Sequence, residues 1–162
     1  DAVSARLAGV EFEEVETWSG PPTPPPGPVA TRRLTFVDAG AFVRSAPPWG
    51  LRGWRTYPEL ITHGVAFGVP HGPGFAALAW VFDQADPYAA LGVYTAPRYR
   101  RLGLGRAAAA ALVRHLVERR GKIPLWSSPT RNAPSRALAE SLGFSPQATE
   151  TLARWKPRIA ED

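Results

Sequence analysis

The sequence predicts a mixed α/β domain, in which strands alternate with helices around an antiparallel hairpin. A continuous apolar run, Phe75 to Phe82, is followed by a turn at Asp83–Pro87 and a second run at Ala89–Thr95. An uninterrupted run of this length is typical of a buried central strand. The next segment, Leu104 to Arg120, places apolar residues along one helical face. Strands and helices that alternate in this way favour a sheet covered by helices.

The composition fits one globular domain. The chain has 162 residues, of which 44% are hydrophobic and 20% are charged. It has no Cys, which excludes disulfides and a thiol nucleophile. No apolar run reaches the roughly 18 residues that a membrane span needs, and no signal peptide is visible. We therefore expect a cytoplasmic protein without a membrane partner. Since the chain contains no Met, its native N-terminus is expected to be trimmed.

Positive charge is concentrated in one part of the chain. The net charge is +5, and residues 96–136 hold ten Arg or Lys against one Glu. Such a patch fits nucleic acid or a polyphosphate ligand. Most of these cations gather at a loop and near a helix end, which favours a compact ligand and argues against nucleic acid.

The N-terminal part reads as an arm. Val10 to Trp18 alternates apolar and polar residues and predicts an edge strand. Pro21 to Pro28 holds six prolines in eight residues, which indicates a polyproline-type linker. We therefore divide the chain into an arm with a Pro-rich linker, residues 1–28, and a domain, residues 29–162.

The elements before the hairpin are short. We expect a strand at Thr31–Thr35, a helix capped by Asp38 that runs to Ser45, a helix at Glu59–His63, a strand at Val65–Val69 and a turn at Pro70–Gly74.

The elements after the long helix begin with Gly121 as its C-terminal cap. We then expect a buried strand at Pro124–Ser127, a second helix capped by Asn132 and ended by Gly143, and one or more final strands from Phe144 through Thr149–Trp155.

The loop before the long helix carries the pattern Arg100-x-x-Gly103-x-Gly105. The free N–H groups of a first helical turn and the helix dipole together favour an anion. Glycines let the backbone approach a ligand, and arginines add forked donors. A diphosphate is the expected guest, although a loop with solvated arginines fits the spacing equally well. The dinucleotide-binding fingerprint fits poorly, because seven residues separate the strand from Gly103.

These segments resemble the GNAT superfamily of acetyl-CoA-dependent N-acetyltransferases. The resemblance rests on the loop VYTAPRYRRLGLGRA, the long helix behind it, and the later run from Asn132 to Gly143-Phe144. It covers roughly residues 75–145. It implies a mixed, mostly antiparallel sheet flanked by helices, with two strands splayed apart at the coenzyme site.

The resemblance also implies where acetyl-CoA binds. The splayed strand would bind the pantetheine arm, with the Val93 N–H on the thioester carbonyl, and the loop N–H groups would bind the pyrophosphate. The implied coenzyme residues are Val93, Tyr94, Thr95, Arg100, Arg101, Leu102, Gly103, Leu104, Gly105, Arg106, Asn132 and Ser135. The implied reaction is direct attack by a primary amine of a small molecule or peptide on the acetyl group, helped mainly by proximity.

Two acid–base residues of this family are missing from their common places. Many relatives have a Tyr where this chain has Ala139, and some have a Glu where it has Ser127. Tyr94, Ser127, Ser128, His71 or an ordered water are the candidate replacements. The departures keep a second hypothesis open, a catalytically silent acyl-CoA-binding or regulatory domain.

The acceptor amine is harder to place. Trp49, Trp54 and Tyr57 form, with Arg52, an aromatic-basic cluster that either lines an acceptor pocket or packs on the sheet. We expect no metal site, and a homodimer is possible.

Overall fold

The computed structural model describes residues 10–19 and 28–155, and it confirms the mixed α/β fold. The elements are β1 (Val10–Ser19), β2 (Arg32–Arg33), the 3₁₀ turn η1 (Phe36–Asp38), α2 (Ala39–Ser45), α3 (Tyr57–His63), β3 (Ala66–His71), β4 (Gly74–Ala85), β5 (Tyr88–Thr95), the 3₁₀ turn η2 (Pro97–Tyr99), α4 (Leu104–Arg120), β6 (Ile123–Pro129), α5 (Ala133–Ser141) and β7 (Ser145–Trp155). Within the described ranges, no helix is long and apolar enough to cross a bilayer.

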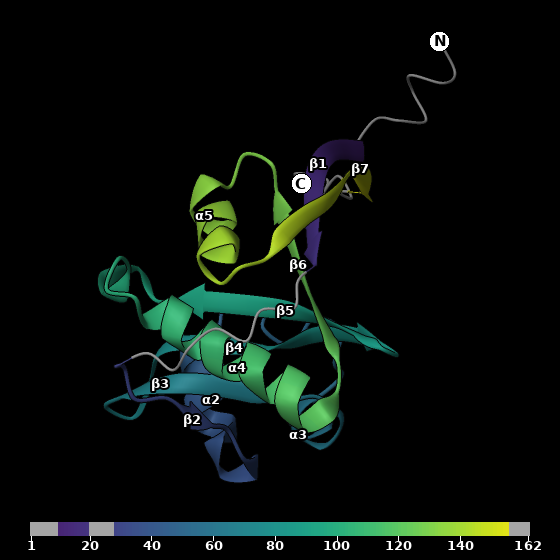
Figure 1. Cartoon of the computed structure of the whole chain (residues 1–162). Helices are drawn as coiled ribbons and strands as arrows, with labels where there is room; N and C mark the ends of the chain where they lie inside the picture. Colours follow the sequence, from purple (N-terminus) through teal and green to yellow (C-terminus); the bar gives the residue numbers. More distant parts are fainter. Residues whose placement is uncertain (1–9, 20–27, 156–162) are drawn as a thin grey trace, which may run out of the picture.

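The strands form one sheet in the order β2-β3-β4-β5-β6-β1-β7 (Figure 1). Neighbouring strands are antiparallel, except that β5 and β6 run parallel. The sheet is therefore mostly antiparallel, as expected. The parallel pair lies where the first half of the sheet, β2 to β5, meets the second half, β6, β1 and β7.

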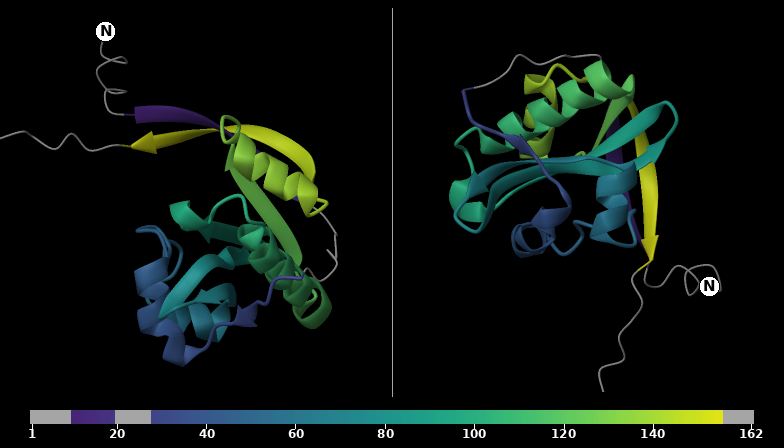
Figure 2. Two further views of the ribbon diagram at one scale, coloured as in Figure 1. Left: turned by 90° about the vertical axis from the view of Figure 1, so that its left-hand side faces the viewer. Right: turned by 90° about the horizontal axis from the view of Figure 1, so that it is seen from below.

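Helices cover both faces of the first half, as the two views in Figure 2 show: α4 lies on one face, and α2 and α3 on the other. Successive strand residues point to opposite faces. Ala79 thus packs in the cluster that contains Leu112 of α4, while Trp80 packs in the cluster that contains Phe42 of α2. Because both faces are buried, β4 needs the unbroken apolar run that the sequence shows.

Helix α4 begins and ends at the predicted residues. Its N-cap Gly103 and its C-cap Gly121 both have the left-handed backbone, φ +75° and +60°, that glycine adopts without a steric cost. Every residue from Ala107 to Val113 is buried. The short alanine side chains allow the helix axis to lie close to the sheet.

Strand β1 is not the edge strand that its alternating pattern predicts. It lies between β6 and β7 and pairs antiparallel with both. Trp18 is only 1% exposed and packs in the same cluster as Trp126. The arm thus contributes a strand to the sheet, and the division of the chain at residue 28 stays a prediction. Residues 20–27, most of the Pro-rich segment, lie outside the described residues.

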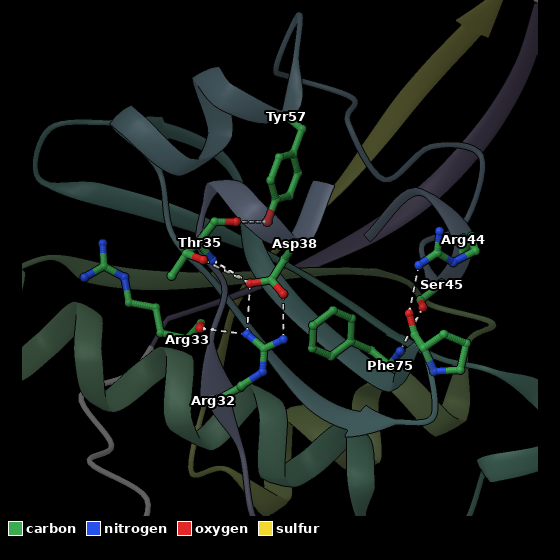
Figure 3. Close-up of polar contacts among 9 residues, drawn as sticks. Arg32, Arg33, Thr35, Asp38, Arg44, Ser45, Tyr57 and Phe75 are labelled. Atoms are coloured by element: carbon green, nitrogen blue, oxygen red, sulfur yellow. Dashed lines mark hydrogen bonds and ion pairs between the residues drawn. The ribbon is translucent and has the colours of Figure 1, made fainter. Parts of the chain in front are cut away.

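The predicted strand Thr31–Thr35 is reduced to Arg32–Arg33, and Asp38 does not cap α2 through its side chain. The Asp38 carboxylate instead accepts two hydrogen bonds from the Arg32 guanidinium, at 2.9 and 2.6 Å, and one from the Thr35 N–H at 2.8 Å (Figure 3). The Tyr57 hydroxyl donates to the Thr35 carbonyl at 2.8 Å. This network joins β2 and η1 to α3.

We expect the Asp38–Arg32 pair to make stability depend on pH. The Arg32 hydrogen bonds hold the pKa of the buried Asp38 carboxyl at about 2, below its ordinary 3.8. Since the folded pKa is the lower one, this contribution is complete above pH 4 and is lost as pH falls towards 2. Because Arg32 is about half exposed and solvent screens the pair, we expect it to contribute on the order of 1–2 kcal/mol to the free energy of unfolding.

Asp38→Asn should therefore lower the free energy of unfolding at pH 7 by that amount and flatten its decline between pH 4 and 2. Urea titrations across this pH range measure both effects. An unchanged pH profile in the variant would show that other carboxylates govern acid unfolding.

Candidate functional site

Strands β5 and β6 part after three residue pairs. Tyr88 to Ala90 pair with Ile123 to Leu125, and no further pair joins the two strands. From Leu125 onwards β6 continues as the partner of β1. Residues 91–95 of β5 keep β4 on one edge and have no strand partner on the other among the described residues. The predicted splayed pair is thus confirmed.

The exposed edge of β5 directs particular backbone groups into the gap. The Ala96 N–H donates to the Ala76 carbonyl, directly opposite, at 3.1 Å. Hydrogen-bonded pairs alternate with non-hydrogen-bonded pairs in an antiparallel ladder. In this register Val93 and Thr95 are non-hydrogen-bonded positions. Their N–H and C=O groups therefore point away from β4, towards the gap.

A second group of backbone donors lies at the start of α4. The first hydrogen bond within the helix runs from the Ala107 N–H to the Gly103 carbonyl at 3.0 Å, so the N–H groups of residues 104–106 have no partner within the helix. The preceding loop is tightly wound, since Arg101 has φ +64° and Gly103 has φ +75°. A non-glycine residue in this region costs roughly 1–3 kcal/mol and is enriched at ligand sites.

Gly105 brings the helix start against β5. A Cβ added there would lie 2.6 Å from the Thr95 Oγ1 and 3.7 Å from the nearest Val93 methyl. Gly105 is thus required for space, whereas Gly103 is required for its backbone angle. The close approach aims the free N–H groups of α4 and of β5 into the same volume.

That volume is a cavity of about 770 Å³. Its lining residues are Val93, Tyr94, Thr95, Arg100, Arg101, Gly103, Leu104, Gly105, Arg106, Trp126, Asn132, Pro134, Ser135 and Leu138. Every predicted coenzyme residue except Leu102, which is 62% exposed, therefore surrounds one cavity. Coenzyme binding by these residues remains a prediction.

The wall opposite β5 is made by β6 and α5. The Trp126 indole N–H donates to the Ser135 Oγ at 3.1 Å, and the Ser135 N–H donates to the Asn132 Oδ1 at 3.3 Å. Sequence reasoning missed Trp126, Pro134 and Leu138 as lining residues. The available signal was the predicted strand at Pro124–Ser127, whose alternation puts one face towards α5.

The arginines differ in their contacts. Arg100 donates to the Thr95 carbonyl at 3.2 Å, and Arg106 donates to the Ser141 carbonyl at 3.0 Å. Arg106 thereby connects the start of α4 to the end of α5. The exposed Arg101 has no side-chain hydrogen bond or ion pair in the described part of the chain, which leaves its charge available at the cavity.

Of the candidate acid–base residues, Tyr94 lines the cavity. Ser127 is exposed, Ser128 is buried with its hydroxyl donating to the Pro129 carbonyl at 3.3 Å, and neither lines the cavity. The His71 ring packs on Tyr99, at 4.6 Å between centroids. Ala139 is fully buried in the core cluster.

The candidate acceptor residues do not line this cavity. Tyr57 is 4% exposed, and its burial raises the pKa of the hydroxyl above its ordinary value. The Trp54 indole donates to the Val81 carbonyl at 2.7 Å. Trp49 packs on Trp80 at 5.4 Å between ring centroids and stays 40% exposed. Packing on the sheet is the role that these contacts show.

In sequence, the chain is similar to acetyltransferases. The GNAT acetyltransferase family profile matches residues 50–151. An uncharacterized N-acetyltransferase, YdfB of Bacillus subtilis, is 28% identical over 99 residues, which are 61% of this chain and 38% of that protein. The chain thus spans about two fifths of this curated relative.

Solved structures share the fold. A GCN5-related N-acetyltransferase-like protein from Streptococcus suis has a TM-score of 0.76 at 19% identity, covering 96% of this chain and 67% of that one. A putative GNAT-family acetyltransferase from Novosphingobium aromaticivorans has a TM-score of 0.69 at 24% identity, covering 88% of this chain and 65% of that one.

We predict that Gly105→Ala destabilises the protein by about 1–3 kcal/mol, because the added methyl group overpacks the contact with the Thr95 Oγ1. The next atom of Thr95, its Cβ, would be 3.9 Å away, an ordinary contact. Removing the hydroxyl in the double variant Gly105→Ala/Thr95→Ala should therefore restore part of the loss. Thermal denaturation of the two single variants and the double variant measures the loss of stability and how much of it is restored. Strictly additive losses would contradict the close approach.

Proposed function

The chain belongs to the GNAT acetyltransferase family, and from this premise we propose that it transfers an acetyl group from acetyl-CoA to a primary amine of a small molecule or peptide. One observation carries the proposal. Two sets of free backbone donors, on the splayed edge of β5 and at the start of α4, converge on one cavity. A protein interior rarely leaves such groups without partners unless water or a ligand takes them.

The residues at the start of α4 fit a pyrophosphate. The free N–H groups of residues 104–106, the helix dipole and the Arg101 guanidinium all favour an anion at the same end of the helix. A volume of about 770 Å³ is within the usual range for a bound organic ligand. Leu104 and Leu138 supply apolar lining for the less polar parts of the ligand.

The edge of β5 fits an extended chain that carries amides. The outward N–H groups of Val93 and Thr95 and the Val93 C=O offer the donors and acceptor that pantetheine needs, while the Thr95 C=O already accepts a hydrogen bond from Arg100. Bound acetyl-CoA supplies an activated acetyl thioester. We assign the Val93 N–H, which points towards the gap, to the acetyl carbonyl oxygen, where such a bond would stabilise negative charge that develops on oxygen.

The remaining task of the protein is to orient the amine and to move protons. Tyr94 is the candidate that we assign to proton transfer, because it is a lining residue of the cavity while Ser127 and Ser128 are not. Tyr94 also packs against the cluster formed by α2 and α3. It therefore stands between the coenzyme side and the opposite face of the sheet, from which we propose that the amine enters.

The first test is binding. Isothermal titration calorimetry with acetyl-CoA should give a dissociation constant below millimolar, and Arg101→Ala should raise it about tenfold by removing one charge-assisted contact. Arg98→Ala is the matched control, since Arg98 lies on the same loop and does not line the cavity. Its guanidinium carbon lies 4.8 Å from the centroid of the Tyr99 ring. If both variants weaken acetyl-CoA binding equally, only the net charge of the loop affects the affinity. If the wild type does not bind acetyl-CoA at all, the proposal is wrong.

The second candidate function is a silent acyl-CoA-binding domain, which Ala139 and the exposed Ser127 favour. Release of free thiol measured across an amine library separates the two functions. For an active enzyme, Tyr94→Phe should lower kcat about 100-fold with little change in acetyl-CoA affinity, whereas Tyr99→Phe should not. If the wild type releases no free thiol with any amine, the result supports the silent acyl-CoA-binding domain.

A further inference from the structure

We propose that Glu16, on the N-terminal strand β1, is a positioning residue that orders the Asn132–Ser135 wall of the cavity. This inference rests on the proposed function for its link to acetyl-CoA. Strand β1 precedes the segment that matches the family profile, residues 50–151. Its side chains nevertheless bind the loop and helix that carry Asn132 and Ser135.

The central contact is an ion pair between β1 and α5. The Arg136 Nε donates to the Glu16 Oε2 at 2.8 Å, and the two side chains are 40% and 16% exposed. The Arg136 Nη1 also donates to the Thr130 carbonyl at 3.5 Å, and the Arg136 backbone N–H donates to the Asn132 carbonyl at 3.1 Å. Glu16 thus holds a residue that bonds both ends of the loop 130–132, Thr130 through its side chain and Asn132 through its backbone.

Two further contacts come from the same strand. The Glu13 carboxylate pairs with Arg131 at 2.5 Å, and the Glu14 carbonyl accepts from the Thr130 N–H at 3.0 Å. Three neighbouring positions of β1 therefore bind three positions of residues 130–136. The loop that enters α5 is fixed by β1 as well as by its own strand β6.

Register connects this clamp to the cavity. Glu16 lies opposite Ser128 and Trp18 opposite Trp126, so Glu16 and Trp126 share the face of the sheet on which α5 lies. Trp126 donates to the Ser135 Oγ, and Ser135 is the residue before Arg136. A shift of Arg136 would therefore move the Ser135 hydroxyl away from Trp126 and would displace the Asn132 side chain bonded to the Ser135 N–H.

The test compares Glu16→Gln with Glu14→Gln in the full chain. Glu14 is the matched control, because it is exposed on the same strand and its carboxylate has no partner in the described ranges. Hydrogen–deuterium exchange should accelerate about tenfold in residues 130–136 for Glu16→Gln and stay unchanged for Glu14→Gln. Arg136→Gln should accelerate exchange less when it is added to Glu16→Gln than when it is made in the wild type, because the contact between the two side chains is already lost.

Acetyl-CoA titration supplies the second readout. Glu16→Gln should raise the dissociation constant about tenfold, while Glu14→Gln leaves it at the wild-type value. Unchanged exchange in residues 130–136, or faster exchange with unchanged acetyl-CoA affinity, overturns the inference. Failure of the wild type to bind acetyl-CoA removes the proposed function instead, and the exchange result then decides alone whether Glu16 orders the wall.

Discussion

The parting of β5 from β6 is the constraint on which the site depends. A central strand of a sheet normally forms backbone hydrogen bonds with two neighbouring strands. Here β5 loses one neighbour after Ala90, so the outward N–H and C=O groups of Val93 and Thr95 are left without a strand. The parting is stable because β6 gains β1 as an antiparallel partner from Leu125 onwards. Sheet continuity is thereby kept while a gap opens within the sheet.

Helix α4 turns this gap into a binding site. Its alanine-rich middle lies close to the sheet, and Gly105 lets its first turn approach Thr95. The unusual backbone angles at Arg101 and Gly103 are needed to lead the chain from η2 into that turn. Local strain and close packing therefore have the same result, which is a set of free helix N–H groups beside the free edge of β5.

Much of this was predictable, because the signals are local. The hairpin of β4 and β5, the bounds of α4 and the helix after Asn132 follow from apolar runs, helical periodicity and caps. Long-range choices were not predictable. The alternation in Val10–Trp18 indicates a strand but does not say that it inserts between β6 and β7. Likewise, the sequence presents Tyr57 as an aromatic beside other aromatics, and only packing decides that it is buried against Phe42.

Amide hydrogen exchange of the full chain, with and without acetyl-CoA, tests the central claim most directly. The account predicts slower exchange on binding in two separate segments, the outward-facing amides of residues 91–95 and the first turn of α4 at residues 103–107. If saturating acetyl-CoA protects neither segment, or protects only other parts of the chain, the account is contradicted.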